Sequence, residues 1–201
     1  MSSLEKIRVG FVMCGSFCTF EKSFAAAQKL VELGCELVPV MSENAYRISS
    51  RFGTAQENHL RLESISGRDI IHTIEAAEPI GPKRMLDVLV VAPCTSNTLA
   101  KLAYGITDTP ATMAVKSHIR NSLPVVLAIA TNDALANSAK NIGMVQNYKH
   151  YFFVPYSQDD YQSKPNSIVS HFDLIPEAIS AALEGKQLQP IMKIYTRDRN
   201  S

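Results

Sequence analysis

Signals for disulfides, metals and membranes are scarce in this 201-residue chain. The cysteines have neither the density of a disulfide-stabilised domain nor the C-x-x-C spacing of a zinc site. They are Cys14, Cys18, Cys35 and Cys94. The five histidines are scattered without metal-type pairing. No run of about 18 apolar residues is present, as a membrane-spanning helix requires. We therefore expect reduced thiols, no metal and no membrane insertion.

An excess of basic charge is also missing. Lys and Arg number 20 against 19 for Asp and Glu, so the chain cannot neutralise many phosphates of a nucleic-acid backbone. Nucleic acid is therefore not an expected partner. The first 13 residues contain no apolar stretch followed by a small-residue cleavage site. The sequence predicts a cytoplasmic protein.

What is present suits one globular domain. Hydrophobic residues make up 46% of the chain and charged residues 19%, which is enough apolar material for a buried core. No Pro-, Gly- or Ser-rich stretch divides the chain into halves. We predict one domain over residues 1–185 and a C-terminal tail over residues 186–201.

Apolar runs and helical periodicity alternate along the chain. Strands are predicted over residues 7–13, 36–41, 87–92, 124–129 and 151–154. Helices are predicted over residues 20–31, 55–63, 69–77, 99–103, 110–121, 132–145 and 175–183. Pro39 lacks an N–H group and favours an edge or bulged position for its strand. This order predicts an α/β fold with a three-layer, doubly wound parallel sheet of the Rossmann-like type.

Small and polar residues follow three of the predicted strands. They are Cys14-Gly-Ser-Phe-Cys-Thr19, Ser42 and Cys94-Thr-Ser-Asn-Thr98. Ligands of open parallel sheets bind at the carboxyl ends of the strands, where helix N-termini favour anions. The loops match neither G-x-G-x-x-G nor the Walker motif, which disfavours dinucleotides and nucleoside triphosphates. They predict a phosphate-bearing ligand; the alternative is that Thr95, Ser96 and Asn97 merely cap a helix.

The segment Ala92-Pro-Cys-Thr-Ser-Asn-Thr-Leu-Ala-Lys-Leu-Ala103 resembles the Pro-Ala-Thr-Ala-Asn-Thr motif of flavoproteins that bind flavin mononucleotide (FMN). That family includes cysteine decarboxylases and prenyl-flavin synthases, and Gly15-Ser16 and Ser42 resemble its other loop motifs. The resemblance implies FMN as cofactor. The cofactor-binding residues it implies are Gly15, Ser16, Ser42, Cys94, Thr95, Ser96, Asn97, Thr98, Thr131, Asn132 and Tyr161.

Within this family, residues 131–135 and 158–167 resemble a branch that acts in bacterial dipicolinate synthesis. This resemblance implies the oxidation of dihydrodipicolinate to dipicolinate, in the mother cell of a sporulating bacterium. It also implies an A subunit as partner, which is similar to a nicotinamide-dependent dehydrogenase and carries NAD(P), and a homo-oligomer that is a trimer or larger. The hydride acceptor is then either the flavin or the partner's nicotinamide.

Two departures from the family argue against its other activities. The decarboxylases place a catalytic histidine where this chain has Pro79-Ile-Gly-Pro82, and the prenyl-flavin synthases place an arginine where it has Ala130-Thr-Asn-Asp133. The alternatives remain a stand-alone prenyl-flavin synthase or decarboxylase and a non-catalytic scaffold. No catalytic residue is assigned; candidate counter-charges for a dianionic product are Lys164, Arg51 and Arg47.

Overall fold

A seven-stranded sheet forms the centre of the molecule in the computed structural model, which describes residues 4–193. The strand order is β2-β1-β3-β4-β7-β6, and β5 also pairs with β4. The strands are β1 (Arg8–Met13), β2 (Glu36–Met41), β3 (Val88–Cys94), β4 (Val125–Thr131), β5 (Tyr151–Phe153), β6 (Tyr156–Ser157) and β7 (Ile168–Ser170). The first five are parallel, whereas β7 runs antiparallel to the end of β4 and to β6.

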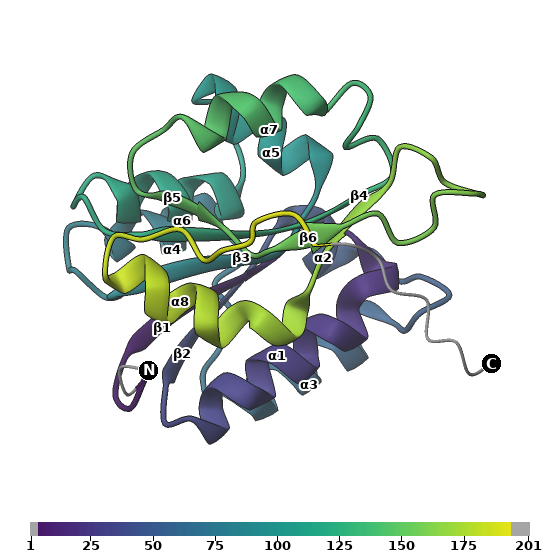
Figure 1. The fold of residues 1–201 in the computed structure, drawn as a ribbon. Helices are drawn as coiled ribbons and strands as arrows, with labels where there is room; N and C mark the ends of the chain where they lie inside the picture. The colour runs from purple at the N-terminus through teal and green to yellow at the C-terminus, as the bar shows by residue number, and fades with distance from the viewer. Residues whose placement is uncertain (1–3, 194–201) are drawn as a thin grey trace.

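Helices cover both faces of the sheet, so that the molecule has three layers (Figure 1). One face carries α1 (Phe20–Glu32), α3 (Ala55–Ser66) and α8 (Ile175–Leu183). The other carries α4 (Ile74–Ala77), α5 (Ser96–Tyr104), α6 (Pro110–Ile119) and α7 (Ala139–Gln146). The short α2 (Glu43–Arg47) follows β2, and three 3-10 turns are η1 (Phe17–Thr19), η2 (Glu78–Ile80) and η3 (Phe172–Leu174).

The uninterrupted apolar runs of the central strands are explained by burial on both faces. In β1, Phe11 and Met13 belong to the apolar cluster beneath α1 and α8, whereas Val12 belongs to the cluster beneath α5 and α6. Successive side chains of a strand point to opposite faces, so a strand covered on both sides needs apolar residues at every position. The predicted three-layer α/β fold is therefore confirmed. Pro39 lies in the edge strand β2, as predicted.

Two predicted helices were wrong in part, and one hairpin was missed. Residues 69–77 contain only the single turn of α4, because Ile71 bridges to Val40 and extends the pairing of β2. In residues 132–145 the helix begins only at Ala139, because Asp133 holds the preceding segment in turns. The hairpin of β6 and β7 was missed, since strands of two and three residues give no periodic pattern.

The first part of the predicted tail, residues 186–193, lies along the sheet, where Gln187 exchanges two hydrogen bonds with the backbone of Phe153. The remainder of the predicted tail lies outside the described residues. Within residues 4–193 no helix has the length and apolar character needed to cross a membrane. The same residues contain no group of three His, Cys, Asp or Glu side chains placed to hold a metal ion.

Candidate functional site

Three helices begin around one hollow at the carboxyl ends of the strands. The residue that caps each helix lines this hollow: Ser42 for α2, Thr95 for α5 and Thr109 for α6. We call it the small hollow; its volume is about 290 Å³ and its lining is Gly15, Ser42, Glu43, Asn44, Thr95, Asn97, Thr98, Lys101 and Thr109. Helix N-termini present unpaired N–H groups and partial positive charge, so their convergence favours an anion here.

A larger hollow of about 520 Å³ adjoins the small one, because Gly15 and Thr95 line both. We call it the large hollow. Its lining comes from the loops after β1, β3 and β4, the loop before β7, the first turn of α1, the end of β4 and β7 itself. It consists of Gly15, Ser16, Cys18, Thr19, Lys22, Thr95, Ser96, Ala130, Thr131, Asn132, Asp133, Asp159, Lys164 and Val169. Both volumes lie near or within the range of ~300–1,000 Å³ that small-molecule sites occupy.

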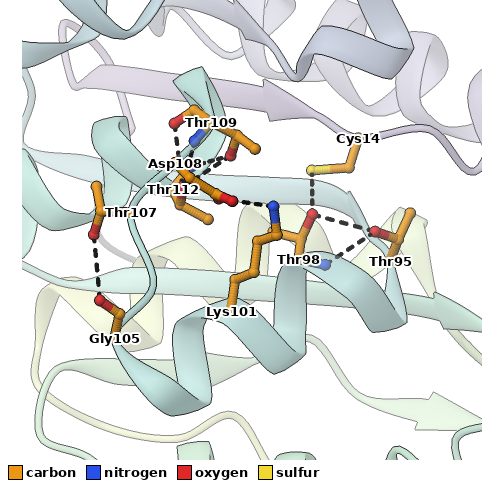
Figure 2. A network of polar contacts seen from close by, with 9 residues as sticks. All are labelled: Cys14, Thr95, Thr98, Lys101, Gly105, Thr107, Asp108, Thr109 and Thr112. Carbon is orange, nitrogen blue, oxygen red and sulfur yellow. Dashed lines mark hydrogen bonds and ion pairs between the residues drawn. The ribbon is translucent and has the colours of Figure 1, made fainter.

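A network of hydroxyl groups fixes the wall between β1, α5 and α6 (Figure 2). The Thr98 hydroxyl donates to the sulfur of Cys14 at 3.3 Å, and the Thr95 hydroxyl donates to Thr98 at 3.2 Å. The Lys101 ammonium lies 2.7 Å from an Asp108 carboxylate oxygen. The one lysine that lines the small hollow therefore already has a carboxylate partner, and the helix N-termini remain the main attraction for an anion there.

Helix capping accounts for Thr95 but not for its neighbours. The Thr95 hydroxyl accepts a hydrogen bond from the Thr98 N–H at 3.3 Å, which is the N-cap bond of α5. The side chains of Ser96 and Asn97 form no hydrogen bond within residues 4–193, and they line the large and the small hollow respectively. Ser96 is half-buried and Asn97 is exposed, so both polar groups are open to water or to a ligand in the hollows, and capping accounts for Thr95 alone.

The thiols near the site differ in exposure. Cys14 and Cys94 are buried, whereas Cys18 is exposed and lines the large hollow. Burial raises the pKa of the Cys14 thiol to about 11 and that of Cys94 well above its ordinary value. Both buried thiols are therefore protonated at neutral pH and serve as packing groups.

The structure brings together most of the predicted cofactor-binding residues. Those that line one or both hollows are Gly15, Ser16, Ser42, Thr95, Ser96, Asn97, Thr98, Thr131 and Asn132. Cys94 is fully buried and lines neither hollow. Tyr161 is 53% exposed and lines a separate hollow with Leu135 and Tyr156.

The charged residues of the site were harder to predict. Lys164 lines the large hollow, but Arg47 pairs with Glu43 at 2.9 Å and Arg51 lies over the ring of Phe52, and neither arginine lines a hollow. Lys22 was missed. Its position one turn after Thr19 on the helix that follows the first loop is the feature from which it was predictable.

A family model described as Flavoprotein matches residues 1–179. This chain belongs to the flavoprotein family. The B subunit of dipicolinate synthase from Bacillus subtilis is 45% identical to it over 192 residues, which are 96% of each chain.

Solved structures agree with this family assignment. The crystal structure of the B subunit of dipicolinate synthase from Bacillus halodurans has a TM-score of 0.89 at 37% identity and covers 96% of this chain and 100% of its own. Burkholderia xenovorans DmrB, solved in complex with FMN as a cubic protein cage for redox transfer, has a TM-score of 0.66 at 20% identity and covers 89% of this chain and 96% of its own. The second likeness shows the shared fold.

Proposed function

We propose that this chain is the B subunit of a dipicolinate synthase, which oxidises dihydrodipicolinate to dipicolinate together with an A subunit. The observation that carries this proposal is the 45% identity to the Bacillus subtilis B subunit over nearly the whole length of both chains. The reaction takes a hydride and a proton from a partly reduced ring and leaves an aromatic pyridine dicarboxylate. We place it in a sporulating cell, as the resemblance implies.

We further propose that FMN occupies the two hollows. Ser42, Thr95 and Thr109 lie at three helix starts that converge on the small hollow, which suits the phosphate group of FMN. The side chains of Ser96 and Asn97, which have no hydrogen-bond partner within residues 4–193, suit the hydroxylated ribityl chain of FMN. The flavin ring then lies in the large hollow, beside Thr131 at the end of β4 and the following residue Asn132. A flavin bound there supplies a hydride acceptor; the protein residues orient it and exclude water.

Hydrogen bonds within the loop that follows β4 support this placement. The Thr131 hydroxyl donates to an Asp133 carboxylate oxygen at 2.5 Å, and Ser138 donates to the same oxygen at 3.0 Å. These bonds fix the loop that borders the large hollow, so its amide and hydroxyl groups are held in place before a ligand binds.

Reconstitution tests the function. The purified chain, an A subunit and their mixture are each supplied with dihydrodipicolinate, FMN and NAD(P), and dipicolinate is measured by its ultraviolet absorbance. We expect full synthesis only in the mixture. An A subunit that makes dipicolinate at the same rate without this chain contradicts the two-subunit proposal, whereas turnover of dimethylallyl phosphate or of a cysteinyl peptide by this chain alone favours the stand-alone alternatives.

A further inference from the structure

A further hollow, also of about 520 Å³, lies between α1 and the segment from β7 to the start of α8. We call it the groove. Ala25 and Ala26 of α1 line it on one side, and Phe172 and Pro176 line it on the other. Figure 1 shows α1 and α8 on the same face of the sheet. None of the residues proposed above to hold FMN lines the groove, so it is a separate feature of this face.

Two lysines stand at the groove on the α1 side. Lys22 and Lys29 are seven residues apart, which places them on one face of the helix and about 10 Å apart along its axis. The two alanines between them leave space beside the helix. Lys22 forms no ion pair within the described part of the chain, and the Lys29 ammonium lies 3.8 Å from Glu32 in an exposed pair, which is a weak interaction. Both ammonium groups are thus available to an anion.

The opposite side of the groove contributes the ring of Phe172, the imidazole of His171 and little negative charge. Among residues 4–193, Asp173 is the only acidic residue in the lining. The imidazole of His171 lies 3.0 Å from the Ser157 hydroxyl. Burial lowers the pKa of His171, and the nearby Lys193 and Lys22 lower it further, although Asp173 acts in the other direction. The imidazole is therefore neutral at pH 7, and the lysines dominate the charge around the groove.

We propose that the groove binds a flat organic dianion of the aromatic dicarboxylate class, with its ring between α1 and Phe172 and its carboxylates at Lys22 and Lys29. An apolar middle with cations at both ends matches a ring that carries two anionic groups. Lys22 also lines the large hollow, so the bound dianion lies directly beside the proposed flavin site. The choice of dipicolinate and its dihydro precursor within this class rests on the proposed function.

Calorimetric titration of the FMN-saturated, full-length chain with dipicolinate tests the groove. Lys29→Gln removes one ammonium that lines the groove but not the large hollow, and Ala25→Leu fills the space beside α1 at an exposed position. We expect Lys29→Gln to raise the Kd for dipicolinate about fivefold and Ala25→Leu to raise it at least as much. The matched controls are Gln28→Leu on the same helix and Lys186→Gln in another exposed pair, and we expect both to bind as the wild type does.

FMN affinity is measured for the same variants. We expect it to stay unchanged in Lys29→Gln and Ala25→Leu, since neither residue lines a flavin hollow. Wild-type affinity for dipicolinate in both groove variants overturns the proposal, as does the absence of dipicolinate binding to the FMN-saturated wild type. If the complex with the A subunit makes no dipicolinate but the groove variants still bind dipicolinate more weakly than the wild type, the proposed function is contradicted. The proposal that the groove binds an aromatic dicarboxylate is then supported.

Discussion

One thiol in four should react with an alkylating reagent in the native protein, and ligand binding should protect it. Cys18 is exposed, whereas Cys14, Cys35 and Cys94 are buried. Burial also raises the pKa of Cys14 and Cys35 from 9.0 to about 11. Since the thiolate is the nucleophile, such a rise leaves roughly one hundredth of the thiolate at neutral pH, in addition to the loss of access.

The assay is timed alkylation with N-ethylmaleimide, followed by intact mass and peptide mapping. We expect one rapid adduct, at Cys18, and no rapid adduct in a Cys18→Ser variant. Because Cys18 lines the large hollow, bound FMN should block it. At ten times the Kd only about a tenth of the chains remain free, so the labelling rate should fall about tenfold. Several adducts that form at equal rates, or a labelling rate that FMN does not change, would refute this reasoning.

Three further predictions concern stability and are measured by urea unfolding. Burial lowers the pKa of His118 from 6.5 to about 4, so its contribution to the free energy of unfolding is complete above pH 6.5 and is lost as the pH falls towards 4. Between about pH 7 and pH 4.5 the wild type should lose about 2 kcal/mol more than His118→Gln, and equal losses would exclude the effect. A Cβ atom at Gly81 would overlap a backbone carbonyl of α6, so Gly81→Ala should destabilise by about 2–3 kcal/mol. Gly143→Ala has open space in α7 and should stabilise by about 0.5–1 kcal/mol; a loss of stability there would contradict the helix-propensity argument.

The central sheet was predictable because burial on both faces imposes an uninterrupted apolar run that few other structures require. The loop after β3 was predictable for a related reason. A run of polar residues between two buried elements predicts a loop with a role beyond packing, and in the structure Ser96 and Asn97 line the two hollows. Thr109 directly precedes the helix predicted from residue 110, but only the tertiary fold brings it to the same hollow as Ser42.

Other parts depend on contacts that a single sequence does not encode locally. The segment after β4 has helical periodicity, but the hydrogen bonds of Asp133 to Thr131 and Ser138 stabilise turns instead. Tyr161 belongs to the same loop as Lys164, yet the two side chains line different hollows. Lys22 lines both the large hollow and the groove only because α1 packs against η3, the turn that follows β7.

Equilibrium titration of the purified full-length chain with FMN, followed by flavin fluorescence and visible absorption, tests the central claim most directly. We expect saturable binding of one FMN per chain. Replacing Ser96 and Asn97 together by Ala should raise the Kd roughly tenfold, since each hydrogen bond to an uncharged hydroxyl of the FMN chain contributes about 0.5–1.5 kcal/mol. Tyr161→Phe is the control, and its Kd should stay unchanged. A wild-type chain that takes up no FMN, or a double variant that binds it as tightly as the wild type, would contradict the account.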